Sequence, residues 1–170
     1  DEEGKRIGTA EKLKAHQGGG QLHEAFSIFI FNSDGELLLQ KRVAGKYHSS
    51  GGLWSNTCCS HPQPSESLNH ATHRKLKQEL GFTCDLQKAF DFTYKEEVGD
   101  LTEWEYDHVF VGYCDPQPDP NPKEVADWKW IAADKVLEDV HSHPEEYTSW
   151  FKLLVEKVID YVHSHGNAPE

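Results

Sequence analysis

The sequence predicts an α/β protein of the α+β kind, and three features of its pattern lead to this prediction. Residues 25–31 form an aromatic and β-branched run, which is typical of a strand that is buried on both faces. Residues 101–113 alternate between polar and apolar side chains, which predicts a strand with two different faces. Residues 65–80 and 144–162 carry apolar side chains at helical spacing, so we expect helices that pack against these strands.

Length and charge limit the classes of protein and partner. A chain of 170 residues has the size of one domain, and we expect a single domain over 1–170 with residues 1–15 as a loosely ordered N-terminal extension. The net charge of −12 disfavours nucleic acid and anionic membranes as partners. No apolar run approaches the roughly 20 residues that a membrane span needs. Four cysteines at this low density predict free thiols in a reducing compartment, and we expect a cytoplasmic protein.

Two histidines flank a run of three glycines near the N-terminus. His16 and His23 lie on either side of Gly18-Gly19-Gly20, a flexible turn. In one interpretation both histidines are exposed to solvent beside an ordinary glycine loop. In the other, the loop folds two imidazoles onto one metal ion, since imidazole is a common ligand of transition metals.

The strand over 25–31 is expected to form a hairpin with its neighbour. Asn32-Ser33-Asp34-Gly35 has the composition of a hairpin turn, and residues 36–42 form the returning strand. That strand ends on Lys41 and Arg42, and Lys46 follows shortly after. In such an acidic chain these bases either cover a solvated strand end or meet an anion.

The most informative stretch is Asn56-Thr57-Cys58-Cys59-Ser60-His61-Pro62. It places the Cys59 thiol two residues from the His61 imidazole. A thiol can give and take a proton, and an imidazole can hold a metal ion. We interpret this stretch as the centre of a metal-dependent proton-transfer site.

The next helix has recognisable ends. Ser65 is the expected N-cap, and Gly81 is the expected C-cap. A short loop after Gly81 leads into a strand within residues 82–95, and residues 96–100 are expected to form a polar turn.

Acidic side chains share one face of the strand over 101–113. Glu103 and Glu105 point to the same side and lie about 7 Å apart along the strand, close enough to share one cation. The alternative is an ordinary solvated face. Val109 and Val111 continue the same face, which favours acids at the mouth of a buried site.

The C-terminal part is predicted to add a strand and two helices. Prolines at 116, 118, 120 and 122 indicate a stiff extended connection before a strand over 125–131 and a short helix over 132–140. Pro144 is expected to open the final helix, whose apolar stripe is core. Trp150 near its beginning belongs either to this core or to the wall of a pocket.

Four pieces of the sequence together resemble the type 1 isopentenyl-diphosphate delta-isomerases, a branch of the Nudix superfamily. The resemblance runs from about Gly8 to Val162, and its pieces are the 56–62 motif, His16 with His23, Glu103-Trp104-Glu105 and Thr148-Ser149-Trp150-Phe151. It implies a Nudix-type α/β/α sandwich with a mixed sheet. It also implies an enzyme that moves the double bond of isopentenyl diphosphate to give dimethylallyl diphosphate.

The resemblance assigns roles to individual residues. The implied ligands of one divalent cation (Mn²⁺, Zn²⁺ or Fe²⁺) are His16, His23, His61, Glu103 and Glu105. A second ion, Mg²⁺ arriving with the diphosphate, matches Glu79. The implied catalytic residues are Cys59, Glu105 and Tyr94, and the implied substrate-binding residues are Lys12, Arg42, Lys46, Lys75 and Trp150. The expected partner is therefore a small diphosphate, and we expect a monomer or a weak homodimer.

Two other functions compete with this interpretation. A Nudix hydrolase of a nucleoside diphosphate derivative is one, because Glu66, Arg74 and Glu79 keep part of the Nudix spacing. However, Lys75 and Gln78 occupy two acidic positions of that motif, and a hydrolase needs those carboxylates to assemble several Mg²⁺ ions. The other is a non-catalytic metal-binding relative. The presence of both Cys59 and Glu105 argues against it.

Overall fold

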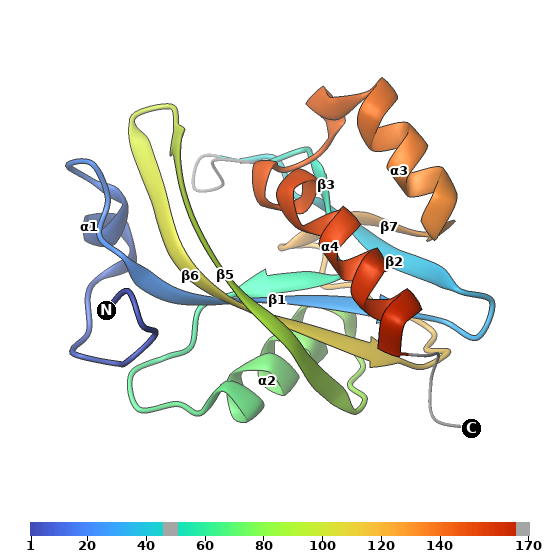
Figure 1. Ribbon diagram of the computed structural model, residues 1–170, viewed down its shortest axis with the longest axis horizontal. Coiled ribbons are helices and arrows are strands. Elements are labelled where there is room, and N and C mark those ends of the chain that lie inside the picture. Colours follow the sequence, from blue (N-terminus) through green and yellow to red (C-terminus); the bar gives the residue numbers. More distant parts are fainter. Residues whose placement is uncertain (46–50, 166–170) are drawn as a thin grey trace.

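The computed structural model describes residues 1–45 and 51–165, and a seven-stranded mixed sheet lies at its centre (Figure 1). The strands are β1 (His23–Phe31), β2 (Glu36–Arg42), β3 (Trp54–Ser55), β4 (Cys58–Ser60), β5 (Leu86–Val98), β6 (Leu101–Tyr113) and β7 (Val125–Ala132). The helices are α1 (Lys12–His16), α2 (Leu68–Leu80), α3 (Ala133–Ser142), the 3₁₀ turn η1 (Pro144–Glu146) and α4 (Ser149–His165). No helix among the described residues is long and apolar enough to cross a lipid bilayer.

Strand β1 organises the sheet. It pairs in parallel with β6, in a register that runs from His23 opposite Glu105 to Phe31 opposite Tyr113. It pairs antiparallel with β4 and β2, so the sheet is mixed. The predicted hairpin partner β2 contacts β1 only near the turn, at Phe31 opposite Leu37, and forms a longer ladder with β7.

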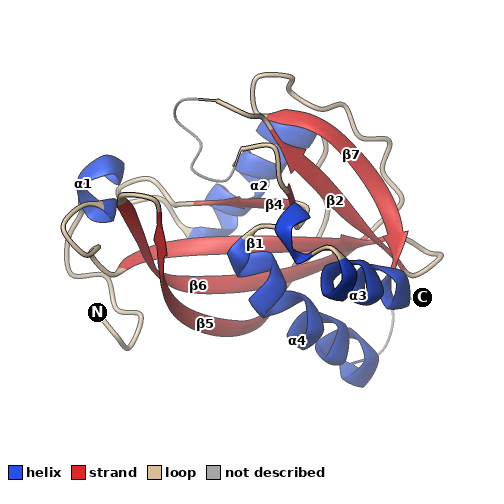
Figure 2. Ribbon diagram, turned by 90° about the horizontal axis from the view of Figure 1, so that it is seen from above, coloured by secondary structure: helices blue, strands red, loops and turns tan. Residues whose placement is uncertain are grey.

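The helices cover both faces of the sheet, because successive side chains of β1 point to opposite sides. Phe26, Ile28 and Ile30 pack with the buried residues of α2. Phe29 and Phe31 pack instead with the apolar stripe of α4. Figures 1 and 2 show α2 on one side of β1, with α3 and α4 on the other. The expected α/β/α sandwich is confirmed.

Helix α2 begins later than the sequence predicted. Its N-cap is Ser67, whose hydroxyl accepts a hydrogen bond from the backbone N–H of His70 at 3.1 Å. Ser65, the predicted cap, lies in the left-handed region with φ 62° and belongs to the preceding turn. Ser65 and Ser67 were both possible N-caps by residue type, and the conformation of the preceding turn makes Ser67 the cap. The predicted C-cap is confirmed, since Gly81 ends the helix with φ 76°.

Pro144 does not open the final helix as predicted. It starts the separate 3₁₀ turn η1, and α4 begins at Ser149. Between the two, Tyr147 is extended and forms a β-bridge with Trp54, and the Thr148 N–H donates to the Trp54 carbonyl at 2.9 Å. This contact with β3 interrupts the helix, and no local signal in the sequence announces it.

The hairpin of β5 and β6 is longer than expected. The strands pair from Leu86 opposite Gly112 to Val98 opposite Leu101, so most of the predicted polar turn over 96–100 is strand. In this register Glu96 stands opposite Glu103, and Lys95 just before it stands opposite Trp104. The hairpin projects beside α1 (Figure 1), and this brings one end of β6 to the N-terminal segment.

Glu66 holds the turn that precedes α2. Its carboxylate accepts two hydrogen bonds from Arg74, at 2.7 and 2.8 Å, one from His70 at 2.6 Å and one from the Gln63 N–H at 2.9 Å. The hydrogen-bonding capacity of the Glu66 carboxylate is therefore used by partners within the protein. The Arg74 guanidinium holds the pKa of Glu66 well below its ordinary value.

This depressed pKa predicts how stability depends on pH. A carboxyl whose pKa is lower when folded stabilises the protein above its unfolded pKa, and the stabilisation is lost as pH falls. We expect Glu66→Gln to lower the unfolding midpoint at pH 7, and the gap from the parent protein to shrink below about pH 4. Thermal unfolding of both proteins between pH 7 and pH 3 measures this gap. The exposed Glu156→Gln is the control, with no gap at any pH; a gap for Glu66→Gln that stays constant down to pH 3 contradicts the assignment.

Candidate active site

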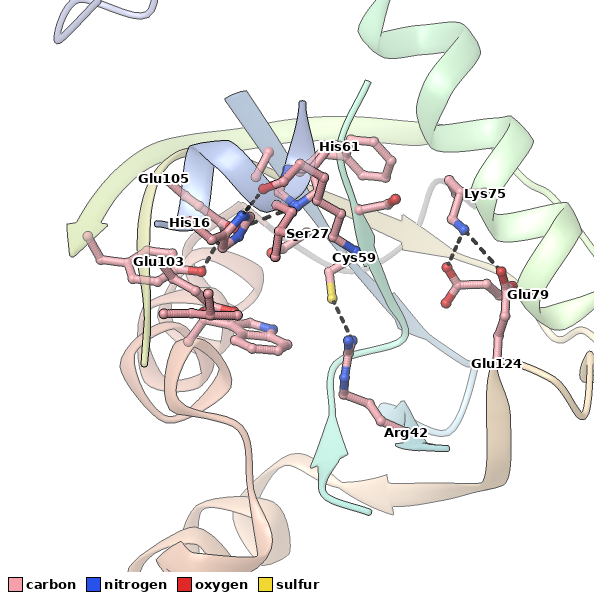
Figure 3. Close-up of a pocket in the computed structure, with 18 of the residues that line it drawn as sticks. His16, Ser27, Arg42, Cys59, His61, Lys75, Glu79, Glu103, Glu105 and Glu124 are labelled. Atoms are coloured by element: carbon pink, nitrogen blue, oxygen red, sulfur yellow. Dashed lines mark hydrogen bonds and ion pairs between the residues drawn. The ribbon is translucent and has the colours of Figure 1, made fainter. Parts of the chain in front are cut away.

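A cavity of about 620 Å³ lies beside β1, with walls contributed by elements from most of the chain. Figure 3 shows the histidines and glutamates of α1, β6 and the end of β4 on one side and Lys75 and Glu79 of α2 on the other, with Cys59 and Arg42 between them. The cavity therefore joins a group of nitrogen and oxygen ligands, a thiol and a charged end.

Three imidazoles and one carboxylate converge on one side of this cavity. One ligand atom each from His16, His23, His61 and Glu105 lies within 4.8 Å of the others. The parallel register of β1 and β6 puts His23 directly opposite Glu105, and the Nε2 of His23 lies 3.5 Å from the carboxylate. His16 is buried, so the interpretation of exposed histidines beside a glycine loop is wrong.

The backbone orients all three rings in the same way. The Nδ1 atoms of His16, His23 and His61 lie 2.6, 2.7 and 3.1 Å from the carbonyl oxygens of Lys12, Gln21 and Glu24, respectively. A carbonyl can only accept, so each Nδ1 carries a proton, and in the neutral ring the free lone pair is on Nε2. This second layer of contacts is typical of histidines that bind metal ions.

Unpartnered buried atoms complete the case for a cation. The Nε2 of His23 and the Oε2 of Glu103 are buried and have no hydrogen-bond partner among the described residues. An unpaired buried polar atom is costly, and coordination to a cation removes that cost. Three nitrogens and carboxylate oxygens suit a divalent transition metal. Glu103 lines the cavity but lies outside the group of four converging ligand atoms, so its role as a ligand stays a prediction.

The glycine loop approaches β6 closely at one residue. A Cβ atom on Gly20 would lie 2.9 Å from the Cγ2 of Thr102, next to Glu103. A Cβ on Gly18 would meet nothing within 4 Å, although its φ of 60° is also in the left-handed region. Gly20 is thus the position at which the loop carrying both histidines rests on β6.

This contrast predicts the metal content of two matched variants. Gly20→Ala should push the loop away from β6, displace the histidines and lower metal affinity by about tenfold or more. Gly18→Ala has the same backbone strain without the clash and should retain the metal. Elemental analysis after dialysis against a weak chelator measures this, with His16→Ala as the positive control. Equal metal retention in the two glycine variants would show that the close approach does not position the histidines.

Cys59 lies in the middle of the cavity. Strand β4 pairs with β1 so that Cys59 stands opposite Ser27, while Cys58 points to the other face and packs with the core below α2. The Nη1 of Arg42 donates to the Cys59 sulfur at 3.5 Å, and the guanidinium lies 5.2 Å from the centre of the Trp150 ring. Trp150, expected in the core or in a pocket wall, is both buried and part of the cavity lining.

Burial gives the ionisable groups of the cavity unequal acidities. It raises the pKa of Cys59 to about 12, and Arg42 opposes only part of that rise, so the thiol is protonated at neutral pH. Burial and the adjacent Glu105 raise the pKa of Glu103 to about 7. Burial would also raise the pKa of Glu105, but protonated imidazoles at His23 and His61 together with the Tyr94 hydroxyl would lower it to about 2. With neutral rings, a cation on the Nε2 lone pairs would supply the positive charge that those protons supply here. Tyr94 donates to the Oε2 of Glu105 at 2.6 Å.

The other end of the cavity is a cluster of charged side chains. The Nζ of Lys75 lies 3.2 Å from Glu79 and 3.5 Å from Glu124. Gln40 is buried and donates to the Oε1 of Glu79 at 2.9 Å. Gln78, the other residue at an acidic position of the Nudix motif, is exposed and donates to Glu124. An ammonium group therefore stands in the cavity where the Nudix motif has a carboxylate.

The predicted phosphate-binding bases are partly brought together. Lys12, Arg42 and Lys75 line the cavity. Lys41, in contrast, lies over the Trp54 ring at 5.9 Å and not in the cavity lining. Lys46 falls outside the described residues.

Several residues of the site were missed in the sequence. Gln40, Ser27 and Glu124 line the cavity, and Asn56 is a fully buried partner of Trp150. Asn56 lies inside the 56–62 motif, so its polar side chain in a stretch of cysteines was a signal. For Glu124, in a loop after the prolines, no local signal existed.

Comparison with known proteins agrees with this geometry. The NUDIX domain model matches residues 21–151. Among solved structures, a protein from Deinococcus radiodurans (DR0079) superposes with a TM-score of 0.75 at 17% identity, over 92% of this chain and 94% of its own. A MutT protein from Methanosarcina mazei superposes with a TM-score of 0.68 at 20% identity, over 86% and 96% of the two chains. At these identities the likeness concerns the fold.

Two bacterial relatives are much closer in sequence. Isopentenyl-diphosphate Delta-isomerase 2 of Aromatoleum aromaticum is 52% identical over 141 residues, which cover 82% of this chain and 74% of the relative. Isopentenyl-diphosphate Delta-isomerase of Halorhodospira halophila is 48% identical over 147 residues, 84% of this chain and 83% of the relative. The chain therefore belongs to the Nudix family and, within it, to the isopentenyl-diphosphate Delta-isomerases.

Proposed function

We propose that the chain interconverts isopentenyl diphosphate and dimethylallyl diphosphate by adding one proton and removing another. The observation that carries this proposal is that a thiol, Cys59, and a carboxylate, Glu105, line one cavity from strands that pair with the two edges of β1. Moving a double bond by one carbon needs an acid and a base that act on the two carbons on either side of a central carbon.

The floor of the cavity leaves room for a small hydrocarbon. Strand β1 runs between β4, which carries Cys59, and β6, which carries Glu105. The β1 residues in the cavity lining are Ala25, Phe26 and Ser27; Ala25 and Ser27 are small, and the Phe26 side chain packs in the core with α2. A five-carbon skeleton above Ala25 and Ser27 would have the thiol towards one side and the carboxylate towards the other. The bound substrate would then have little translational and rotational entropy left to lose in the transition state.

The proton transfers follow from this arrangement. One of the two groups delivers a proton to the terminal methylene carbon, and the π electrons of the alkene form the new C–H bond. The neighbouring carbon becomes a tertiary cation. The other group then removes a proton from the adjacent methylene, and that C–H electron pair becomes the new double bond. Tyr94 holds the Glu105 carboxylate in place through its hydrogen bond.

The cation intermediate needs protection and stabilisation. The face of Trp150 in the cavity wall can stabilise positive charge without offering a lone pair that reacts with it. Water must be excluded because it would trap the cation as an alcohol.

A divalent cation fits the group of His16, His23, His61 and Glu105, with Glu103 as a further ligand, because their free lone pairs converge. Bound there, a Mn²⁺, Zn²⁺ or Fe²⁺ ion would supply positive charge that fixes and polarises the Glu105 carboxylate. Residues of the chain orient these ligands: the three backbone carbonyls determine which ring nitrogen of each histidine is protonated, and the Tyr94 hydroxyl fixes the orientation of the Glu105 carboxylate.

The charged end of the cavity suits the diphosphate. Lys12, Arg42 and Lys75 supply positive charge, with Lys46 as a further candidate, and Glu79 would hold a Mg²⁺ ion that arrives with the substrate. Binding energy from this end, remote from the reacting carbons, pays for placing the alkene between acid and base. We further propose that the protein acts in the cytoplasm, as a monomer or weak homodimer, on a small diphosphate rather than on nucleic acid or membranes.

Deuterium incorporation tests the proposed reaction. Incubation with isopentenyl diphosphate in D₂O should give dimethylallyl diphosphate that carries deuterium in one methyl group, detected by NMR. Phosphate release is followed in the same samples, because a hydrolase would release it. Phosphate release without labelled product would overturn the proposal in favour of hydrolysis, and the absence of both products would overturn the proposed isomerisation.

A further inference from the structure

Asn56 is a fully buried amide whose whole hydrogen-bonding capacity is used. Its Nδ2 donates to the carbonyl oxygens of Ile28 and Cys58 at 3.1 and 2.8 Å. Its Oδ1 accepts from the Ser55 hydroxyl at 2.8 Å and from the indole Nε1 of Trp150 at 3.1 Å. Two donors and two accepted bonds are all that a carboxamide side chain normally makes.

These bonds link two segments that line the reaction cavity. Through Cys58, the amide is bonded to strand β4, whose next residue is Cys59. Through the indole, it is bonded to the first turn of α4. A second bond between the same two segments links the Ser55 and Thr148 hydroxyls at 2.9 Å. The N–H is the only polar group of an indole. The hydrogen bond to Asn56 therefore limits rotation of the Trp150 ring, which forms part of the cavity wall.

We propose that Asn56 is a positioning residue of the isomerisation, which fixes the plane of the Trp150 ring relative to the Cys59 thiol. This rests on the proposed function. Attraction between a cation and an aromatic ring depends on the face being presented to the charge, so a tilted ring stabilises the intermediate less. Misplacement by about 1 Å can cost about a hundredfold in rate. Asn56 touches neither the substrate nor the metal ligands in this scheme and acts through Trp150.

A double-mutant cycle on kcat tests the coupling. Asn56→Ala and Trp150→Phe each remove the same hydrogen bond, and we expect each to lower kcat by about tenfold, with little change in KM because the diphosphate end is untouched. If Asn56 acts through the indole, the double variant should be little slower than Trp150→Phe alone. If the two losses in kcat multiply, the proposal is wrong.

A readout on the ring itself does not depend on turnover. The Nε1–H signal of Trp150, assigned by its absence in Trp150→Phe, should be protected from hydrogen exchange in the parent protein and lose protection in Asn56→Ala. Thr57→Val is the matched control: Thr57 is as buried, donates to the Leu38 carbonyl and accepts from the Ile30 N–H, but has no bond to Trp150. It should lower stability and leave the indole protected.

Asn56→Asp covers the case in which Asn56→Ala does not fold. The carboxylate keeps an acceptor for the indole while it loses both donors, so protection of the Trp150 Nε1–H should persist although stability falls. Equal exchange in the parent protein and in Asn56→Ala, or loss of protection in Thr57→Val as well, would overturn the positioning role. Absence of isomerisation by the parent protein would overturn the proposed function and leave the indole measurement readable.

Discussion

Cys59→Ala is expected to lower kcat for isomerisation by about 10³-fold or more, since a positioned acid or base commonly contributes 10²–10⁴. The variant removes one of the two proton-transfer groups from the cavity. The thiol lies in the lining rather than in the tightly packed core, so the fold should survive. Steady-state kinetics with isopentenyl diphosphate and circular dichroism measure the two effects.

Cys58→Ala is the natural control for this prediction. Cys58 is the adjacent residue on the same strand, but it points to the opposite face and packs with the core below α2. It should lose some stability and keep kcat within a few-fold of the parent protein. Similar losses of kcat in the two variants would mean that the strand, and not the Cys59 thiol, is what matters.

Glu105→Gln should be equally severe, for two reasons. The amide keeps the shape of the side chain but cannot accept a proton at neutral pH, and it weakens the binding of a cation by the adjacent imidazoles. We expect kcat to fall by about 10³-fold or more, together with a lower metal content by elemental analysis.

The exposed Glu97→Gln, on the same hairpin of β5 and β6, removes the same charge outside the cavity and should change neither quantity. Full activity in Glu105→Gln with bound metal would remove this carboxylate from the proton transfer. Normal turnover with reduced metal content would instead show that the reaction does not depend on the metal.

Much of the fold was accessible from local pattern. The run at 25–31, the alternation at 101–113 and the apolar stripe of the last helix correctly predicted β1, β6 and α4. In each case the spacing of apolar residues made the prediction possible, because a buried face requires apolar side chains at regular intervals within the same segment. Helix ends were less certain. Ser65 and Ser67 are equivalent caps in sequence, and Pro144 begins a 3₁₀ turn because Tyr147 bridges to β3.

The candidate site was predicted in its members but not in its geometry. His16, His61 and Glu105 were singled out by residue type and spacing and do line one cavity. Their convergence depends on the parallel pairing of β1 with β6, two strands that are separated in the sequence by β2, β3, β4, α2 and β5. Local propensity is silent about such a partner, since a strand's own sequence specifies its faces and not its neighbour.

By itself, the sequence determined the long strands and helices, which of their faces are buried and which side chains have the chemistry for proton transfer and metal binding. Only the tertiary structure decided the relations among them: the inward Nε2 atoms set by three backbone carbonyls, the close approach at Gly20, and the amide of Asn56 that reaches Trp150 across 94 residues. The physical reason is that these relations are contacts between distant segments. They exist only when burial of the whole sheet holds those segments together.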